Sequence, residues 1–306
     1  MLSDVSLHTL RYGLSTFDDI DISQDKNFIV GGSRGGRVIV WDLETGKILW
    51  NTWKHKEWVN GVAFSPDGSI IVSVAFDKIN IWDVNEKKRL YKTKPPKKFL
   101  TAGQWAVRVA FGISNNFVVI GLSKGDIIIL DIPTRQYLQK IVRVGRYVRD
   151  MCITSDGNRI IAAGNDGSVA SVGFFDSHLH FHKKIFNKDI LSLDCSADMK
   201  YIATSSKKAP LRVLDFSSGE IAFEIPMDKK KSFSTLAITP DSKYIIGKID
   251  NLKKLKIHKL NTGELVEEIN FPAKYVQCLK ISSDGQFLAA SSGNKILVLE
   301  LKHYLD

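Results

Sequence analysis

Hydrophobic and polar residues alternate along this chain in short runs that end at tight turns. The pattern is most complete over residues 53–84, where apolar-rich runs at 58–64 and 70–74 flank the turn SPDG at 65–68. A third run ends at Trp82 and Asp83. Alternation with a period of two is typical of half-buried strands, and Pro, Asp and Gly favour turns. Residues 53–84 therefore predict three strands of an antiparallel meander.

The turn at residues 65–68 recurs along the chain. Its six relatives begin at Ser23, Gly112, Thr154, Ser196, Thr239 and Ser282. Successive turns are 42, 47, 42, 42, 43 and 43 residues apart, and a period of about 40–45 residues is that of a four-stranded propeller blade. One such unit cannot bury its own faces, so it must stack against copies of itself. Seven turns therefore predict seven blades.

Residues 55–83 resemble one complete WD40 repeat and end in its Trp-Asp pair. The positions of the family's structural tetrad are occupied by His55, Ser73, Asp77 and Trp82. The resemblance extends over nearly the whole chain and implies an all-β fold, a seven-bladed β-propeller of four-stranded antiparallel blades. We accordingly expect residues 1–306 to form a single propeller domain. In this context the His, Ser and Asp side chains are interpreted as a scaffold rather than as a hydrolase triad.

The two ends of the chain are predicted to pair with each other. Residues 5–11 alternate apolar and polar side chains but precede the first full repeat, whereas the last repeat stops after its third strand, near residues 295–302. An N-terminal strand that completes the last blade would close the ring and remove its open edges.

Charged and aromatic residues single out one face of this ring. The net charge is +10, with 43 Lys and Arg against 33 Asp and Glu. The loops opposite the SPDG-like turns carry the candidate partner-binding cations Arg34, Arg37, Lys97, Lys98, Arg146, Arg149, Lys207, Lys230 and Lys254. Seven positions before four of these turns lie the candidate anchors Trp58, Trp105, Tyr147 and Tyr275. We expect these aromatic side chains around the mouth of the central channel, where they would hold a partner.

The function expected from the resemblance and the charge is that of a non-enzymatic interaction scaffold. Its basic, aromatic-rimmed face would capture an acidic or phosphorylated peptide segment of a larger assembly. The alternative is sequence-independent binding of nucleic acid or anionic lipid by the same face, because lysine acts as a point charge on phosphate. Residues 209–219 resemble the fifth blade of lipid-binding propellers of the autophagy type, but Pro226 and Met227 replace the paired arginines of that family.

Other chemistries find little support in the sequence, and we expect no enzyme activity, cofactor or metal. The glycine-rich segment 31–36 precedes a strand, whereas a phosphate-binding loop precedes a helix. His178, His180 and His182 are spaced too far along an extended strand to share one tetrahedral ion. Residues 42–50 resemble the blade motif of quinone-dependent dehydrogenases, but the full motif occurs once.

Location and assembly can be predicted only in outline. The first thirty residues lack a signal peptide and no apolar run is long enough to span a membrane, so we expect a cytoplasmic or nuclear protein. We further expect a monomer within a complex. Cys152, Cys195 and Cys278 fall in the first strands of different blades, which predicts that they lie apart as buried apolar groups.

Overall fold

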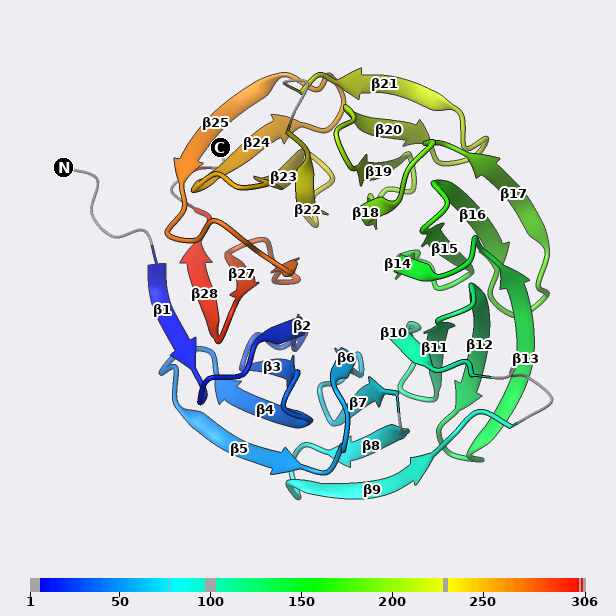
Figure 1. The fold of residues 1–306 in the computed structure, drawn as a ribbon, viewed down its shortest axis with the longest axis vertical. Coiled ribbons are helices and arrows are strands. Elements are labelled where there is room, and N and C mark those ends of the chain that lie inside the picture. The colour runs from blue at the N-terminus through cyan, green and yellow to red at the C-terminus, as the bar shows by residue number, and fades with distance from the viewer. Residues whose placement is uncertain (1–5, 77, 97–102, 228–230, 303, 305–306) are drawn as a thin grey trace.

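The computed structural model describes residues 6–76, 78–96, 103–227, 231–302 and 304. These residues form seven four-stranded antiparallel sheets arranged in a ring around a central channel (Figure 1), as the repeats predicted. The first strand of each repeat lies beside the channel and the fourth lies at the rim. The described residues contain no helical segment that could cross a lipid bilayer.

The blades follow one another in chain order. Blade 1 consists of β2 (Phe17–Ile22), β3 (Phe28–Ser33), β4 (Arg37–Asp42) and β5 (Ile48–Trp53), and blade 2 consists of β6 (Val59–Phe64), β7 (Ile70–Ala75), β8 (Ile79–Asp83) and β9 (Lys88–Thr93). Blade 3 consists of β10 (Ala106–Phe111), β11 (Phe117–Leu122), β12 (Asp126–Asp131) and β13 (Gln136–Arg143), and blade 4 consists of β14 (Val148–Ile153), β15 (Arg159–Gly164), β16 (Ser168–Gly173) and β17 (Leu179–Lys184).

Blades 5 to 7 complete the ring. Blade 5 consists of β18 (Ile190–Cys195), β19 (Tyr201–Ser206), β20 (Leu211–Asp215) and β21 (Ile221–Ile225). Blade 6 consists of β22 (Phe233–Ile238), β23 (Tyr244–Ile249), β24 (Lys254–Lys259) and β25 (Leu265–Asn270). Blade 7 consists of β26 (Cys278–Ile281), β27 (Phe287–Ser292), β28 (Lys295–Glu300) and β1 (Ser6–Arg11).

The SPDG-like turns join the first and second strands of each blade, and their side chains explain why they recur. In blade 2, Ser65 Oγ donates to Asp67 Oδ1 at 2.7 Å, and the same carboxylate oxygen accepts the backbone N–H of Ser69. Five other blades repeat the hydroxyl-to-aspartate bond at 2.5–2.7 Å. Each of these six turns thus satisfies its own backbone, as turns built on Asp and Ser or Thr do.

The hydrophobic core is divided among the seven seams between neighbouring blades. Each buried cluster draws its residues from two adjacent blades; one, for example, packs Val30, Val38 and Val40 of blade 1 against Ile71 and Trp82 of blade 2. The second and third strands are buried on both sides, so each blade needs a neighbour on either side. This requirement closes the sheets into a ring.

The N-terminal strand completes the last blade, which confirms that prediction. β1 pairs antiparallel with β28, with Leu10 opposite Ile296 and Arg11 opposite Lys295. Leu10 is buried in the cluster between blades 7 and 1. The strand therefore covers the edge of β28 and packs at the seam at the same time.

The innermost strands are joined across the seams by side chains. Asp19 and Asp21 of β2 accept the backbone N–H groups of Val62 and Phe64 in β6, at 3.0 and 2.8 Å. Asp150 of β14 and Asp194 of β18 repeat this contact with the next inner strands, at 2.9 and 2.8 Å. These carboxylates satisfy a strand edge that would otherwise face the channel unpaired.

Candidate functional site

The predicted structural tetrad is present in blade 2 over its described members. Trp82 Nε1 donates to Ser73 Oγ at 2.8 Å, and the same oxygen lies 2.8 Å from His55 Nε2. Asn80, which the sequence did not single out, places Nδ2 2.9 Å from the same imidazole nitrogen. Asp77 lies outside the described residues. All four described side chains are buried, so this network holds the blade together and offers no nucleophile to a substrate.

Aromatic side chains form a strip over blades 2 and 3, on the face opposite the SPDG-like turns. Trp58 and Phe76 are more than half exposed, at 53% and 56%. Val59 pairs with Ala75, so Trp58 and Phe76 are the next positions along the chain just beyond this pairing. Phe76 in turn contacts the half-buried Trp105, with ring centroids 4.9 Å apart. Trp58, Phe76 and Trp105 are called the aromatic strip below.

Cations lie against exposed rings at one side of the aromatic strip. The guanidinium of Arg34 is 4.7 Å from the ring centroid of Trp58 and donates to Asp18 at 2.9 Å. Arg37 lies between the rings of Tyr12 and Trp53, at 5.4 and 5.3 Å. Asp18 offsets the charge of Arg34, whereas no carboxylate in the described chain pairs with Arg37, so Arg37 supplies the net positive charge here.

Two further predicted residues meet at the start of blade 4. The guanidinium of Arg149 lies 5.3 Å from the ring centroid of Tyr147 and donates to Asp189 at 2.9 Å. Lys207 approaches the same carboxylate at 3.6 Å. A continuous line of contacts therefore runs from Tyr147 to the turn between β19 and β20.

The remaining predicted site residues are dispersed or not described. Tyr275 is 60% exposed and the Arg146 side chain is exposed, whereas Lys254 pairs with Glu268 of the rim strand β25. Lys97, Lys98 and Lys230 lie outside the described residues. The structure thus gathers Arg34, Trp58 and Trp105 on blades 1–3, gathers Tyr147, Arg149 and Lys207 on blades 4–5, and leaves the others apart.

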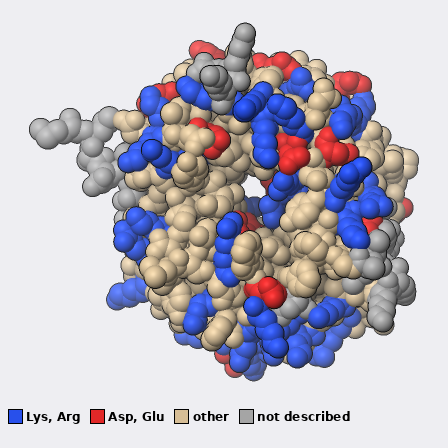
Figure 2. All heavy atoms as spheres, in the orientation of Figure 1, with Lys and Arg blue, Asp and Glu red and all other residues tan. Residues whose placement is uncertain are grey.

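This face carries excess positive charge. Figure 1 looks onto it, because the segments that lead from the rim strands back to the channel cross in front of the blades. Figure 2 shows Lys and Arg side chains spread around the whole face, with Asp and Glu between them at several points. The potential is therefore broad rather than confined to one loop, which suits long-range attraction of acidic partners.

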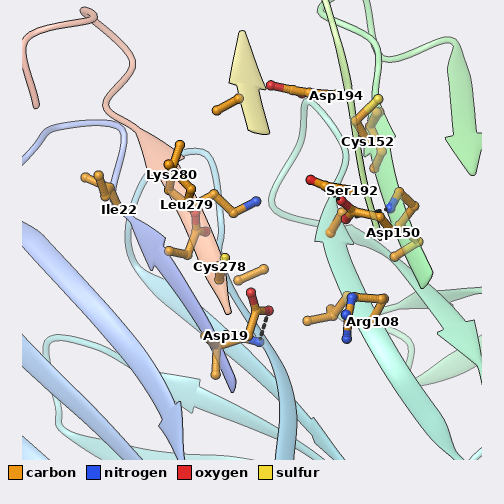
Figure 3. A pocket seen from close by; sticks show the side chains of 18 of the residues that line it. Asp19, Ile22, Arg108, Asp150, Cys152, Ser192, Asp194, Cys278, Leu279 and Lys280 are labelled. Carbon is orange, nitrogen blue, oxygen red and sulfur yellow. Dashed lines mark hydrogen bonds between the residues drawn. The ribbon is translucent and has the colours of Figure 1, made fainter. Parts of the chain in front are cut away.

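The central channel is polar and contains both signs of charge (Figure 3). It encloses about 370 Å³ and is lined by the carboxylates of the inner strands together with Arg108 and Lys280. Burial raises the pKa of Asp21 and of Asp194 to about 6. Burial alone would lower the pKa of Lys280, but the nearby Cys278 and the channel carboxylates raise it. Five aspartates and two cations line the channel, so their charges are only partly compensated.

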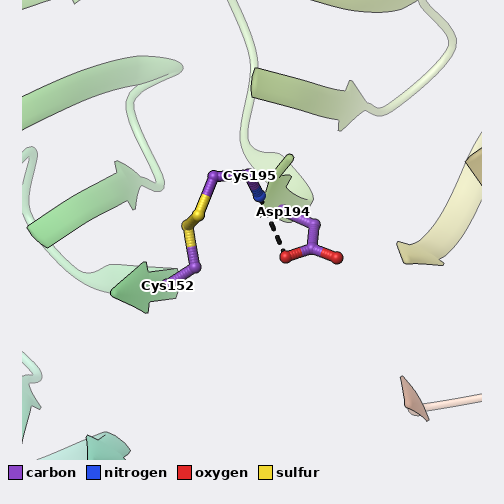
Figure 4. A group of neighbouring side chains, drawn as sticks. All are labelled: Cys152, Asp194 and Cys195. Atoms are coloured by element: carbon purple, nitrogen blue, oxygen red, sulfur yellow. Dashed lines mark hydrogen bonds between the residues drawn. A yellow bond between two sulfur atoms is a disulfide. The ribbon is translucent and has the colours of Figure 1, made fainter. Parts of the chain in front are cut away.

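The expectation that the cysteines lie apart is wrong for two of them. Cys152 of β14 and Cys195 of β18 form a disulfide, with Cα atoms 6.5 Å apart (Figure 4), while Cys278 is a partly exposed free thiol. The physical reason is the repeat itself. Residues 43 positions apart are equivalent in successive blades, and equivalent positions of inner strands are adjacent around the narrow channel.

The same place holds the one group of potential metal ligands found among the described residues. A carboxylate oxygen of Asp194 lies within 4.8 Å of both sulfur atoms. In the disulfide, however, the sulfur atoms are not thiolates, and thiolates are the form that binds metal. The rings of His178 and His180 meet edge to face with centroids 4.8 Å apart, without a third ligand in the described chain.

Comparison with known proteins agrees with this architecture. The model of the family "WD domain, G-beta repeat" matches residues 7–42, 46–83 and 263–299. Among similar proteins, apoptotic protease-activating factor 1 of Danio rerio is 22% identical over 96% of this chain, and WD repeat-containing protein SL1-17 of Schistosoma mansoni is 25% identical over 65%. Human WD repeat and SOCS box-containing protein 1 is 34% identical over 29% of the chain.

These relatives are longer than the stretch they share with this chain. The matched regions span 23%, 65% and 19% of the three relatives, in the order given. This chain therefore spans less than two thirds of the length of each of these relatives. Three repeats of this chain thus match the WD-repeat model, similar proteins include WD-repeat proteins, and the chain folds as a seven-bladed β-propeller.

Proposed function

We propose that this propeller is a protein-interaction scaffold whose basic face captures an acidic peptide segment, with the aromatic strip as its main anchor. The observation that carries the proposal is that Trp58 and Phe76, which both lie just beyond the paired residues Val59 and Ala75, are exposed on a face rich in Lys and Arg. Exposed aromatic rings cost free energy in water, and large stiff rings beside Arg are typical of binding hot spots.

The lysines and the aromatic rings of this face contribute to binding in different ways. The dispersed lysines raise the rate of encounter with an acidic partner, an effect that salt weakens. The rings supply affinity once the partner is in place, because they bury large apolar areas and the Arg34 guanidinium holds the indole of Trp58 in position. We therefore expect the anchors to control dissociation and the cations to control association.

The double variant Trp58→Ala with Phe76→Ala tests the anchor. A short fluorescein-labelled peptide pool rich in Asp and Glu should bind the wild-type ring and lose about tenfold or more in affinity with the variant, measured by fluorescence anisotropy. Phe175→Ala is the matched control, since Phe175 is 64% exposed in a turn of the opposite face and should bind as the wild type does.

Two outcomes would contradict the proposal. One is equal binding by the anchor variant and the wild type. The other is binding of a DNA duplex or of anionic vesicles that persists at near-physiological salt while the acidic pool fails to bind, which would favour the electrostatic alternative.

A further inference from the structure

A cavity of about 220 Å³ opens on the same face between blades 4 and 5. It is lined by residues 185–188, which lead into β18, by the turn 206–209 between β19 and β20, and by Arg212 of β20. These residues are called the basic pocket. One water occupies about 30 Å³ in the liquid, so the basic pocket holds a group of several heavy atoms.

The basic pocket lies where blade 5 has Phe186 and Arg212 in place of the hydrogen-bonded His55 and Asn80 of blade 2. Strand pairing places Arg212 opposite Thr204, as Asn80 lies opposite Ser73 in blade 2. Phe186 lies four residues before its inner strand, as His55 does. Where blade 2 is closed by hydrogen bonds between His55 and Asn80, blade 5 has a guanidinium 4.7 Å from an aromatic centroid.

The Arg212 side chain is held in a fixed orientation. Its Nε donates to Glu224 Oε1 at 2.6 Å and its Nη1 donates to the backbone carbonyl of Ile185. A guanidinium has five N–H donors, and Nη2 makes no hydrogen bond to any described residue. The loop beside it is fixed as well, because Ser206 Oγ donates to the carbonyl of Asp189 at 2.9 Å.

The charges around the basic pocket leave an excess of about two. Lys188, Lys207, Lys208 and Arg212 line it, and the only carboxylates paired with them in the described chain are Asp189, with Lys207, and Glu224, with Arg212. Lys188 and Lys208 have no carboxylate partner among the described residues and are exposed. A phosphomonoester carries about −1.5 to −2 at pH 7 and offers three acceptor oxygens. A carboxylate would leave about half of this excess unmatched.

We propose that the basic pocket binds the phosphate group of a phosphorylated serine or threonine, within the acidic peptide that the aromatic strip anchors. The inference rests on the proposed function, which it deepens by naming the modified residue and its place. Arg212 supplies an oriented donor and Lys188 and Lys208 supply point charges, the combination that recognises phosphate in proteins.

Two observations favour a peptide over a membrane lipid carrying the same phosphate chemistry. The contacts from Tyr147 through Arg149 and Asp189 to Lys207 connect the basic pocket to the channel mouth, where a peptide would cross the face. In addition, the apolar side chains of the pocket lining, Ile185 and Phe186, are buried. The lining thus offers no exposed large apolar side chain that could enter a bilayer.

The test compares two acidic peptide pools that differ only in a central serine or phosphoserine. With the wild-type chain, the phosphorylated pool should bind about tenfold or more tightly by fluorescence anisotropy. The double variant Lys188→Gln with Lys208→Gln should abolish this difference and leave binding of the serine pool nearly unchanged. Lys200→Gln with Lys243→Gln removes the same charge from the opposite face of blades 5 and 6 and should keep the difference.

The possible failures are distinguishable. If the serine pool binds through the aromatic strip but phosphorylation adds nothing, the basic pocket is not a phosphate site and the proposed function stands. If neither pool binds, both proposals fall. If phosphatidylcholine vesicles containing a phosphoinositide bind in a manner that depends on Lys188 and Lys208 while the phosphoserine pool does not, the phosphate belongs to a lipid and the peptide inference is overturned.

Discussion

Ser73 illustrates how much a single hydroxyl group can support in this fold. It is fully buried and is the shared partner of the Trp82 indole and the His55 imidazole. The Ser73→Ala substitution would leave two buried polar groups without this partner, and each such loss costs about 1–3 kcal/mol. We expect the free energy of unfolding to fall by about 2–4 kcal/mol in urea titrations.

Ser205 provides the control for this prediction. It is equally buried, but its Oγ has no hydrogen-bond partner among the described residues. Ser205→Ala should therefore change the free energy of unfolding by less than about 1 kcal/mol. Equal losses in the two variants would show that the tetrad does not stabilise blade 2 through its hydrogen bonds.

Asp194 makes stability depend on pH. Burial raises the pKa of its carboxyl from 3.8 to about 6, so between these values the folded chain binds more protons than the unfolded chain. This group therefore favours folding at pH 4, and that contribution is lost as the pH rises through 6. Asp194→Asn retains an oxygen that can accept the Ile238 N–H but no longer titrates.

The measurement is the free energy of unfolding of wild type and Asp194→Asn from pH 4 to pH 7.5. Relative to the wild type, the variant should gain on the order of 1–2 kcal/mol across this range, since one pKa unit corresponds to about 1.4 kcal/mol and channel water screens the charge. A difference that is constant with pH would contradict the assignment.

At the scale of strands, the disulfide joins β14 to β18, two elements that no hydrogen-bonded ladder connects. Cross-linking residues 43 positions apart restricts the unfolded chain, an effect worth about 2–4 kcal/mol. Cys152→Ala with Cys195→Ala should lower the thermal midpoint, and reductant should lower it for the wild type but not for this variant. Cys278→Ala is the control, and thiol labelling that finds three free cysteines in the native chain would refute the cross-link.

The strands also show what the sequence could predict. The SPDG-like turns of six blades are recognisable in the sequence because each satisfies its own hydrogen bonds locally, as Ser65 and Asp67 do. Side-chain contacts between neighbouring blades, in contrast, depend on which strands become neighbours in the ring. The cysteine pair, the contact of Phe76 with Trp105 and the stacking of Arg212 on Phe186 all depend on that packing. The strand that precedes Phe76 is buried on both faces, so alternation does not indicate that Phe76 is exposed, and nothing local pairs Arg212 with Phe186.

At the scale of the whole molecule, closure depends on a short N-terminal strand. Leu10 is 3% exposed and packs at the seam between blades 7 and 1, whereas the adjacent Thr9 is exposed. Leu10→Ala should lower the free energy of unfolding by about 2–4 kcal/mol, as truncation of buried leucine does, and Thr9→Ala should leave it nearly unchanged. Urea denaturation distinguishes the two, and equal effects would mean that β1 does not support the ring.

The pairing of β1 with β28 also has a consequence for the order of events during synthesis. Among the strands of the ring, β1 is synthesised first and must wait for β28, because Leu10 pairs with Ile296. At about 5–20 residues per second this interval lasts on the order of 15–60 s. During it, blades 1 to 6 can already stack on one another, each against the one made just before it, while β1 has no partner strand. The blades thus form an open stack with two unfinished ends until β28 has been synthesised.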